Sequence, residues 1–192
     1  MYNACTAYES EHYKALFPDC RVEGIDYGGN TPWEAGKEIR AAVEALYNDN
    51  CDIVLIANSI GAYFAMHAHI EPYLKRAFFI SPIIDMQALI TQLMAAEQVS
   101  EALLKEKGTI PTAFGEDLSW DCLCYVREHP LQWRVPTDIL YGEKDTLTSL
   151  EAIKTFAAKA GASLSVMKGG EHWFHTPEQM RFIDNRILQA KV

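Results

Sequence analysis

The sequence has few positive charges for its length. Lys and Arg together number 17, against 26 Asp and Glu, so the formal net charge is −9. A chain of this sign repels the phosphate backbone of nucleic acids. We therefore expect no nucleic-acid partner.

Long apolar runs and paired cysteine motifs are also missing. No apolar stretch approaches the roughly 20 residues that a membrane-spanning helix needs, and the N-terminus lacks the pattern of a secretory signal. The five cysteines form an odd, scattered set, which predicts no disulfide framework. We expect a soluble, cytoplasmic protein with no membrane partner.

The chain is long enough for one domain with a substantial core, because its 192 residues are 49% hydrophobic. We assign residues 1–192 to a single domain. Short apolar segments bounded by Gly, Pro, Asn or Asp alternate with longer segments of helical spacing, which predicts an α/β fold with a mostly parallel sheet flanked by helices. The expected strands are residues 21–26, 52–58, 76–81, 137–142 and 163–167. The expected helices are residues 8–17, 32–47, 60–71, 147–160 and 177–189.

Residues 85–134 interrupt this alternation. They hold helical stretches at about 85–97, 98–107 and 117–128 and no convincing strand. Their apolar and aromatic residues either pack the segment onto the domain or cover a pocket, and we predict a small helical lid insertion. The residues concerned are Met86, Leu89, Leu93, Met94, Phe114, Trp120, Tyr125 and Trp133.

A serine follows the predicted strand at residues 52–58, and a predicted helix begins directly after it. Ligands gather at the carboxyl ends of the strands in open parallel sheets. A nucleophile on such a strained turn needs small residues two positions before and two after it, and Ala57 and Gly61 flank Ser59 in this way. The amide of Ile60 lies at the positive end of the helix and can donate to an oxyanion. The motif alone also fits a structural serine.

An acid and a base follow two later strands. Asp145 lies just after the strand at residues 137–142, and His172 follows the strand at residues 163–167 after a pair of glycines. Both therefore belong to the same edge of the sheet as Ser59. Three residues with the chemistry of nucleophilic catalysis reach one rim.

With these residues in this order, the sequence resembles the α/β-hydrolase family. The matching motifs are Ile25-Asp26-Tyr27-Gly28-Gly29, Ala57-Asn58-Ser59-Ile60-Gly61, Tyr141-Gly142-Glu143-Lys144-Asp145 and Gly170-Glu171-His172-Trp173-Phe174. The resemblance implies that Ser59 is the nucleophile, that His172 is the general base and then acid, and that Asp145 orients the imidazole. It also implies a lid at the insertion. Ala57 replaces the glycine that is usual at its position.

The N-terminal part departs from this family. The family places its oxyanion-hole loop after a strand that lies in the sheet between those matching residues 21–26 and 52–58, and this chain has no such strand. We expect that this strand has been lost from the N-terminus, because its absence would leave two rows of backbone groups unpaired in the interior. A sheet that closes differently is the alternative. Ile60 is the one oxyanion donor that the sequence identifies.

Several other polar residues fit simpler roles. Asp85 also follows a strand and is a second candidate for the acid, but its place before a predicted helix favours a cap. His67 and His69 are two apart on a predicted helix and do not share a face, so we expect them to be surface or packing residues.

The sequence predicts no metal and no cofactor. His172 and His175 have helical metal spacing but lack a third ligand, and Cys122 and Cys124 lack a second pair. The glycines after Tyr27 lack the spacing of a dinucleotide-binding turn.

The sequence thus favours a serine hydrolase of the carboxylesterase type (EC 3.1) that cleaves a small ester, thioester or amide through an acyl-enzyme on Ser59. Serine at this position argues against haloalkane and epoxide hydrolysis, which use a carboxylate nucleophile in related enzymes. Tyr27, Asn58 and Trp173 are candidate pocket residues, and the aromatic content favours a partly apolar small-molecule acyl substrate. A non-catalytic binding protein with the same fold is the alternative. The sequence predicts no oligomeric state.

Overall fold

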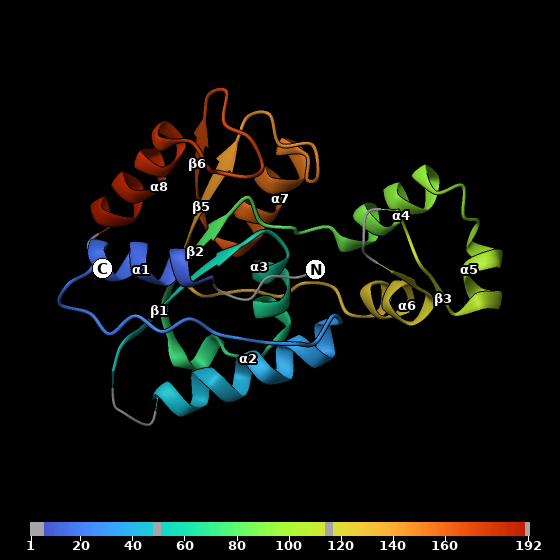
Figure 1. Ribbon diagram of the computed structural model, residues 1–192, viewed down its shortest axis with the longest axis horizontal. Coiled ribbons are helices and arrows are strands. Elements are labelled where there is room, and N and C mark those ends of the chain that lie inside the picture. Colours follow the sequence, from blue (N-terminus) through green and yellow to red (C-terminus); the bar gives the residue numbers. More distant parts are fainter. Residues whose placement is uncertain (1–5, 48–50, 114–116, 191–192) are drawn as a thin grey trace.

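The computed structural model describes residues 6–47, 51–113 and 117–190. Within these residues the main sheet has four parallel strands in the order β1-β2-β5-β6 (Figure 1). The strands are β1 (Ile53–Asn58), β2 (Leu74–Ile80), β5 (Thr137–Gly142) and β6 (Ser163–Met167). This arrangement confirms the predicted α/β fold with a mostly parallel sheet.

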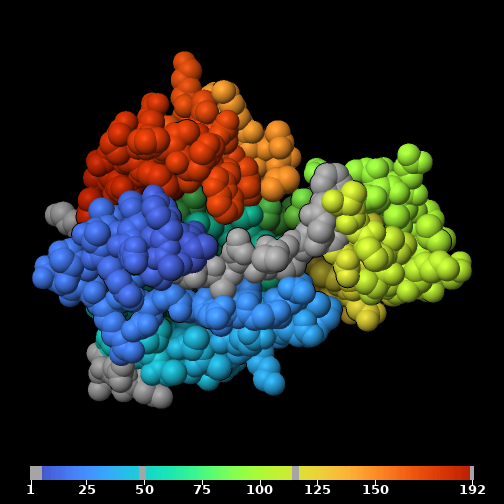
Figure 2. All heavy atoms as spheres, in the orientation of Figure 1, coloured from blue at the N-terminus to red at the C-terminus, as the bar shows by residue number. Residues whose placement is uncertain are grey.

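Helices cover both faces of the sheet (Figure 1). One face carries α1 (Ala7–Leu16) and α8 (Pro177–Gln189), which lie side by side in Figures 1 and 2 and are joined by His12 Nε2 and Asp184 Oδ1 at 2.8 Å. The other face carries α2 (Pro32–Tyr47), α3 (Ser59–His67) and α7 (Leu150–Ala160). Alternate strand residues therefore enter two apolar clusters, as with Phe78 and Phe79 of β2.

Local signals explain most helix boundaries. Thr176 and Gln179 form a capping box before α8, with Pro177 at the first helical position. The helix α7 begins later than predicted because Ser149 caps it by accepting a hydrogen bond from the Ala152 amide. The helix α3 is shorter than predicted and is followed by a turn of 3₁₀ helix, η1 (Glu71–Tyr73).

The predicted strand at residues 21–26 is wrong. These residues have no regular secondary structure and form no ladder with β1. The physical reason is that a strand exists only beside a partner. A groove separates this segment from β1, so its backbone has no adjacent strand to pair with.

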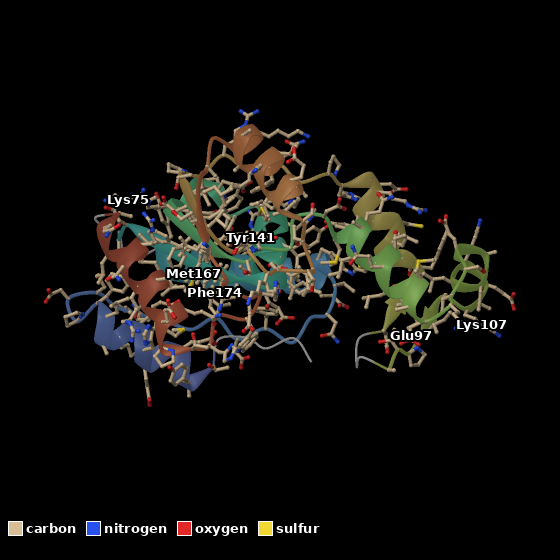
Figure 3. All side chains as sticks on the ribbon, turned by 90° about the horizontal axis from the view of Figure 1, so that it is seen from above. Lys75, Glu97, Lys107, Tyr141, Met167 and Phe174 are labelled. Atoms are coloured by element: carbon tan, nitrogen blue, oxygen red, sulfur yellow. The ribbon has the colours of Figure 1, made fainter. Side chains whose placement is uncertain are left out.

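The insertion forms a lobe at one side of the sheet (Figures 1 and 3). It contains α4 (Met86–Ala96), α5 (Glu101–Lys107) and α6 (Trp120–Glu128), together with a small antiparallel pair of β3 (Thr109–Ile110) and β4 (Leu118–Ser119) that the sequence did not predict. Glu97 and Lys107 lie on this lobe in Figure 3, far from Met167 and Phe174. Phe114 lies outside the described residues.

The lobe is attached to α2 and α3 by ring contacts. The Tyr125 ring of α6 lies 5.0 Å from the Trp33 ring and 5.5 Å from the His67 ring, centroid to centroid. At the other junction, Trp133 is buried against Phe79 and donates its indole N–H to Thr137 Oγ1 at 2.7 Å. Packing onto the domain therefore accounts for part of the aromatic content of the insertion.

The structure also bears on the cysteines and on the possibility of membrane-spanning helices. The cysteines that the structure describes, Cys20, Cys51, Cys122 and Cys124, are free thiols. In the described ranges, every helix is too short or too polar to cross a bilayer.

Candidate active site

Ser59 stands on a sharp turn between β1 and α3. Its backbone φ is 49°, a left-handed conformation that is uncommon for a residue with a side chain. Asn58 before it is extended, and the Ser59 carbonyl accepts a hydrogen bond from the Ile83 amide at 3.1 Å. The loop after β2 thus ties down the turn that presents the hydroxyl.

Ser59, His172 and Asp145 form one hydrogen-bonded chain. Ser59 Oγ lies 2.8 Å from His172 Nε2, and His172 Nδ1 lies 2.7 Å from Asp145 Oδ2. A neutral imidazole that donates its Nδ1 proton to the carboxylate keeps Nε2 free to accept the serine hydroxyl. The three residues that the sequence placed on one rim are therefore in direct contact.

Asp145 is fixed by the loop in which it lies. Its side chain is fully buried, and Oδ1 accepts hydrogen bonds from the amides of Leu147 (2.9 Å) and Thr148 (3.4 Å). The buried hydroxyl of Tyr141, whose ring lies near the middle of the domain in Figure 3, donates to the Thr148 carbonyl at 2.6 Å. This network leaves Oδ2 directed at the imidazole.

Close backbone contact brings the histidine loop to the acid loop. The Lys144 amide donates to the Gly170 carbonyl at 2.8 Å, and the Glu143 amide donates to the Met167 carbonyl at 3.0 Å. A Cβ at Gly142 would lie 2.7 Å from the carbonyl carbon of Gly170, so only glycine permits this approach.

Phe174 anchors the far side of the histidine loop. It is buried in the apolar cluster that also contains Phe78 and Leu140, and Met167 packs against this cluster. Met167 and Phe174 lie near each other in Figure 3. His172 is thus held between the backbone contacts at Gly170 and the buried ring two residues later.

The predicted oxyanion donor lies at the start of α3. The first amides of a helix have no intrahelical acceptor. Among the described residues, no side chain caps this helix, and the Asn58 amide group donates to Glu9 Oε1 at 3.1 Å. The Ile60 amide is therefore available next to the Ser59 hydroxyl.

The three candidate pocket residues are placed differently. Tyr27 is half-buried with its ring against Phe64, and its hydroxyl lies 3.5 Å from where a Cβ at Gly61 would be. Burial raises the pKa of the Tyr27 phenol, so the group remains a hydrogen-bond donor. Asn58 is exposed, and Trp173 is 66% exposed, so most of its ring faces solvent.

A cavity of about 310 Å³ runs along the outer edge of β1. Its lining includes Tyr27, Ala57, Asn58 and Gly61, so it reaches the immediate neighbours of Ser59. This size lies at the lower end of the range for ligand sites.

The other polar candidates have structural roles. Asp85 caps α4 and accepts a hydrogen bond from the Ala88 amide at 2.9 Å, which confirms the predicted cap. The carboxylate that contacts His172 is that of Asp145. His67 packs between the rings of Tyr63 and Tyr125.

The positioning roles of Tyr141 and Thr148 were missed by sequence reasoning. Tyr141 belongs to the motif Tyr141-Gly142-Glu143-Lys144-Asp145, but the sequence does not show which group its hydroxyl contacts. No sequence pattern marks Thr148. Both act through Asp145 and touch neither the serine nor the histidine in the described bonds.

Comparison with known proteins found no matching family model and no matching curated protein. Solved structures do match. A protein from Agrobacterium vitis S4 described as a hydrolase has a TM-score of 0.75 at 16% identity, covering 93% of this chain and 80% of that one. Alpha/beta hydrolase domain-containing protein 10 from mouse has a TM-score of 0.61 at 17% identity, covering 81% and 68%. A thermophilic esterase has a TM-score of 0.57 at 15% identity, covering 88% and 76%.

At these identities the likeness concerns the fold. It extends over most of this chain in all three cases. The chain has the α/β-hydrolase fold.

Proposed function

We propose that this chain is a serine hydrolase of the carboxylesterase type that cleaves a small ester, thioester or amide. The observation that carries the proposal is the hydrogen-bonded chain from Ser59 through His172 to the buried Asp145. A hydroxyl, a base that accepts its proton and a carboxylate that stabilises the resulting imidazolium are the parts that acyl transfer requires.

The reaction follows from this geometry. Ser59 Oγ attacks the carbonyl carbon while His172 Nε2 takes its proton, and the Ile60 amide donates to the negative oxygen that forms. His172 then gives the proton to the leaving group, and the acyl group remains on Ser59. Water attacks this ester with His172 again as the base, which releases the acid and restores the serine.

The substrate class is inferred from the surroundings of Ser59. The cavity that reaches Ala57 and Gly61 is lined along its length by the apolar residues of β1. The similarity in fold to an esterase is consistent with a carboxylic ester. A small molecule with a partly apolar acyl group fits both observations.

A fluorophosphonate probe tests the proposal. We expect covalent labelling of the wild-type chain, none in Ser59→Ala and strongly reduced labelling in His172→Ala, because the probe reacts only with an activated serine. Ser165→Ala in β6 is the matched control and should label like wild type. A panel of p-nitrophenyl esters of graded chain length then defines the acyl preference.

One observation favours a second candidate, a binding protein that keeps the fold without catalysis. In the part of the chain that the structure describes, Ile60 is the single oxyanion donor identified, and losing one donor typically lowers the rate about 10²- to 10³-fold. If the folded protein takes up no fluorophosphonate at Ser59 and turns over no ester, the hydrolase is excluded and the binding protein becomes the favoured candidate.

A further inference from the structure

The oxygen that becomes negative during attack by Ser59 should lie on the side of the serine away from the base. His172 faces Ser59 from the loop after β6, and the strand order β1-β2-β5-β6 places that loop on the inner side of the edge strand β1. The base must also protonate the leaving group, so the leaving group occupies this inner side. The carbonyl oxygen is then directed to the outer edge of β1, where the cavity lies.

A tyrosine hydroxyl reaches the start of α3 from the other side of this cavity. Tyr27 lines the cavity, as does Gly61 in the first turn of α3. The hydroxyl oxygen of Tyr27 lies 3.5 Å from the position that a Cβ on Gly61 would take. Gly61 directly follows Ile60, whose amide is the donor already identified, and adjacent Cα atoms are about 3.8 Å apart. The hydroxyl and the amide therefore lie at the same end of α3.

The Tyr27 hydroxyl is free to donate. Within residues 6–47, 51–113 and 117–190 it makes no hydrogen bond, although the residue is half-buried. Burial raises the pKa of the phenol, so the oxygen keeps its proton at neutral pH. A partly desolvated donor without an acceptor is unfavourable, and an oxygen atom of a bound substrate would supply the missing acceptor.

Two neighbouring helices hold this tyrosine in position. Its ring meets the buried ring of Phe64 on α3 edge-on, with centroids 6.0 Å apart and planes at 83°. Two residues after Tyr27, the chain packs so closely on α2 that a Cβ on Gly29 would lie 2.5 Å from the Ala35 nitrogen. A donor fixed in advance is what stabilises developing charge effectively.

Asn58 is the other side chain beside Ser59 that could donate into this cavity. Its amide group already donates to Glu9 Oε1 at 3.1 Å. Side-chain hydroxyls and amides serve as oxyanion donors as well as backbone amides do. With Asn58 engaged, the phenol of Tyr27 is the better placed donor.

We propose that Tyr27 is a further catalytic residue, whose hydroxyl donates a second hydrogen bond to the oxyanion formed on attack by Ser59. This role rests on the proposed function. As Ser59 Oγ bonds to the carbonyl carbon, the π electron pair moves to the carbonyl oxygen and His172 takes the serine proton. Tyr27 and the Ile60 amide then each donate to that oxygen and keep their protons. When the bond to the leaving group breaks with the proton from His172, the carbonyl forms again.

Tyr27→Phe tests this role, because it removes the hydroxyl and keeps the ring against Phe64. With p-nitrophenyl acetate, kcat should fall about 10²-fold and KM should change less than about threefold, since the hydrogen bond forms in the transition state. The rate of fluorophosphonate labelling should fall in parallel. Tyr47→Phe, at an exposed tyrosine of α2, is the matched control and should behave like wild type. The thermal unfolding midpoint of Tyr27→Phe should not fall, because the lost hydroxyl has no partner in the described chain.

A change in the substrate separates oxyanion donation from a merely structural effect. In the thiono analogue of the same ester, sulfur replaces the carbonyl oxygen and is a weak hydrogen-bond acceptor. The ratio of kcat between wild type and Tyr27→Phe should therefore shrink to less than about threefold on this substrate. Tyr27→Met, a second side chain without a donor, should show the same pattern.

Three results would overturn the inference. They are wild-type kcat in Tyr27→Phe, an equal loss on the oxygen and thiono esters, and a rise in KM with kcat unchanged. In each of these the wild-type chain is active, so the proposed function stands while the role of Tyr27 fails. A wild-type chain that neither labels nor turns over ester refutes the proposed function, and the role of Tyr27 is refuted with it.

Discussion

At the residue scale, Ser59, the proposed nucleophile, has a strained backbone conformation. Ser59 has φ of 49°, and a left-handed conformation costs an L-residue roughly 1–2 kcal/mol relative to glycine. The turn keeps the hydroxyl clear of the helix and aimed at His172. The strained backbone lowers the stability of the fold at the position where the proposed reaction needs a hydroxyl side chain.

This strain gives a testable difference between two substitutions. Ser59→Gly should be about 1 kcal/mol more stable than Ser59→Ala, because glycine adopts this conformation without a Cβ clash. Urea unfolding of both variants measures it. At Ser165 in strand β6 the order should reverse, with the glycine variant less stable. The same order at both positions would show that Ser59 is not strained.

A second residue-scale prediction concerns the contact between the acid and histidine loops. A Cβ at Gly142 meets the backbone of Gly170 at 2.7 Å and the Glu171 carbonyl oxygen still more closely. Gly142→Ala should therefore push His172 away from Asp145, lower fluorophosphonate labelling at least about tenfold and destabilise the fold by about 1–3 kcal/mol. Gly28→Ala is the control, since nothing lies within 4 Å of a Cβ there. Wild-type labelling of Gly142→Ala would contradict the geometry.

At the element scale, Asp85 and Asp145 follow the neighbouring strands β2 and β5 but make different contacts. Asp85 holds the first turn of α4, whereas Asp145 accepts two loop amides and contacts His172. The chain positions are alike, and the difference lies in what each carboxylate faces.

Substitution separates the two aspartates. Asp85→Ala should lower stability by about 1 kcal/mol through loss of the cap and leave fluorophosphonate labelling unchanged. Asp145→Ala should reduce labelling by about 10³-fold or more, because the imidazole loses its orienting partner. Thermal unfolding and labelling rates measured on the same samples check both. Loss of labelling in Asp85→Ala would transfer the acid role to that residue.

At the scale of the whole molecule, the lobe is joined to the domain by a cluster of rings that contains an ionisable group. His67 lies between Tyr63 and Tyr125, its Nε2 is buried without a partner, and burial lowers its pKa to about 4, with His129 and His69 as smaller contributors. The folded protein therefore resists protonation of this imidazole.

The stability of the whole protein should consequently depend on pH through His67. The unfolded chain takes up this proton below its ordinary value near 6.5 and the folded chain does not, so stability falls as pH drops from about 7 to 4. At pH 5 the loss from this group is on the order of 1–2 kcal/mol. His67→Phe should lose less stability than wild type between pH 7.5 and pH 5 in thermal unfolding. His69→Asn, at an exposed position, should follow wild type; equal losses in all three would refute the role of His67.

The sequence alone determined most elements of the fold. The short apolar run Ile139-Leu140-Tyr141 favours burial on both faces of a sheet, and residues 137–142 form a strand at the predicted position. Capping residues such as Thr176 fixed helix starts without help from the rest of the chain. The positions of Ser59, Asp145 and His172 after three strands placed them on one rim, since parallel strands share their carboxyl edge.

Tertiary structure decided what local patterns leave open. Residues 21–26 have a strand-like sequence, but a strand needs a partner at hydrogen-bond distance, and that depends on the groove beside β1. The choice of Asp145 over Asp85 depends on a 2.7 Å contact between loops 27 residues apart. Side-chain chemistry and periodicity are local and can be read along the chain, whereas pairing and contact are properties of segments brought together only by the fold.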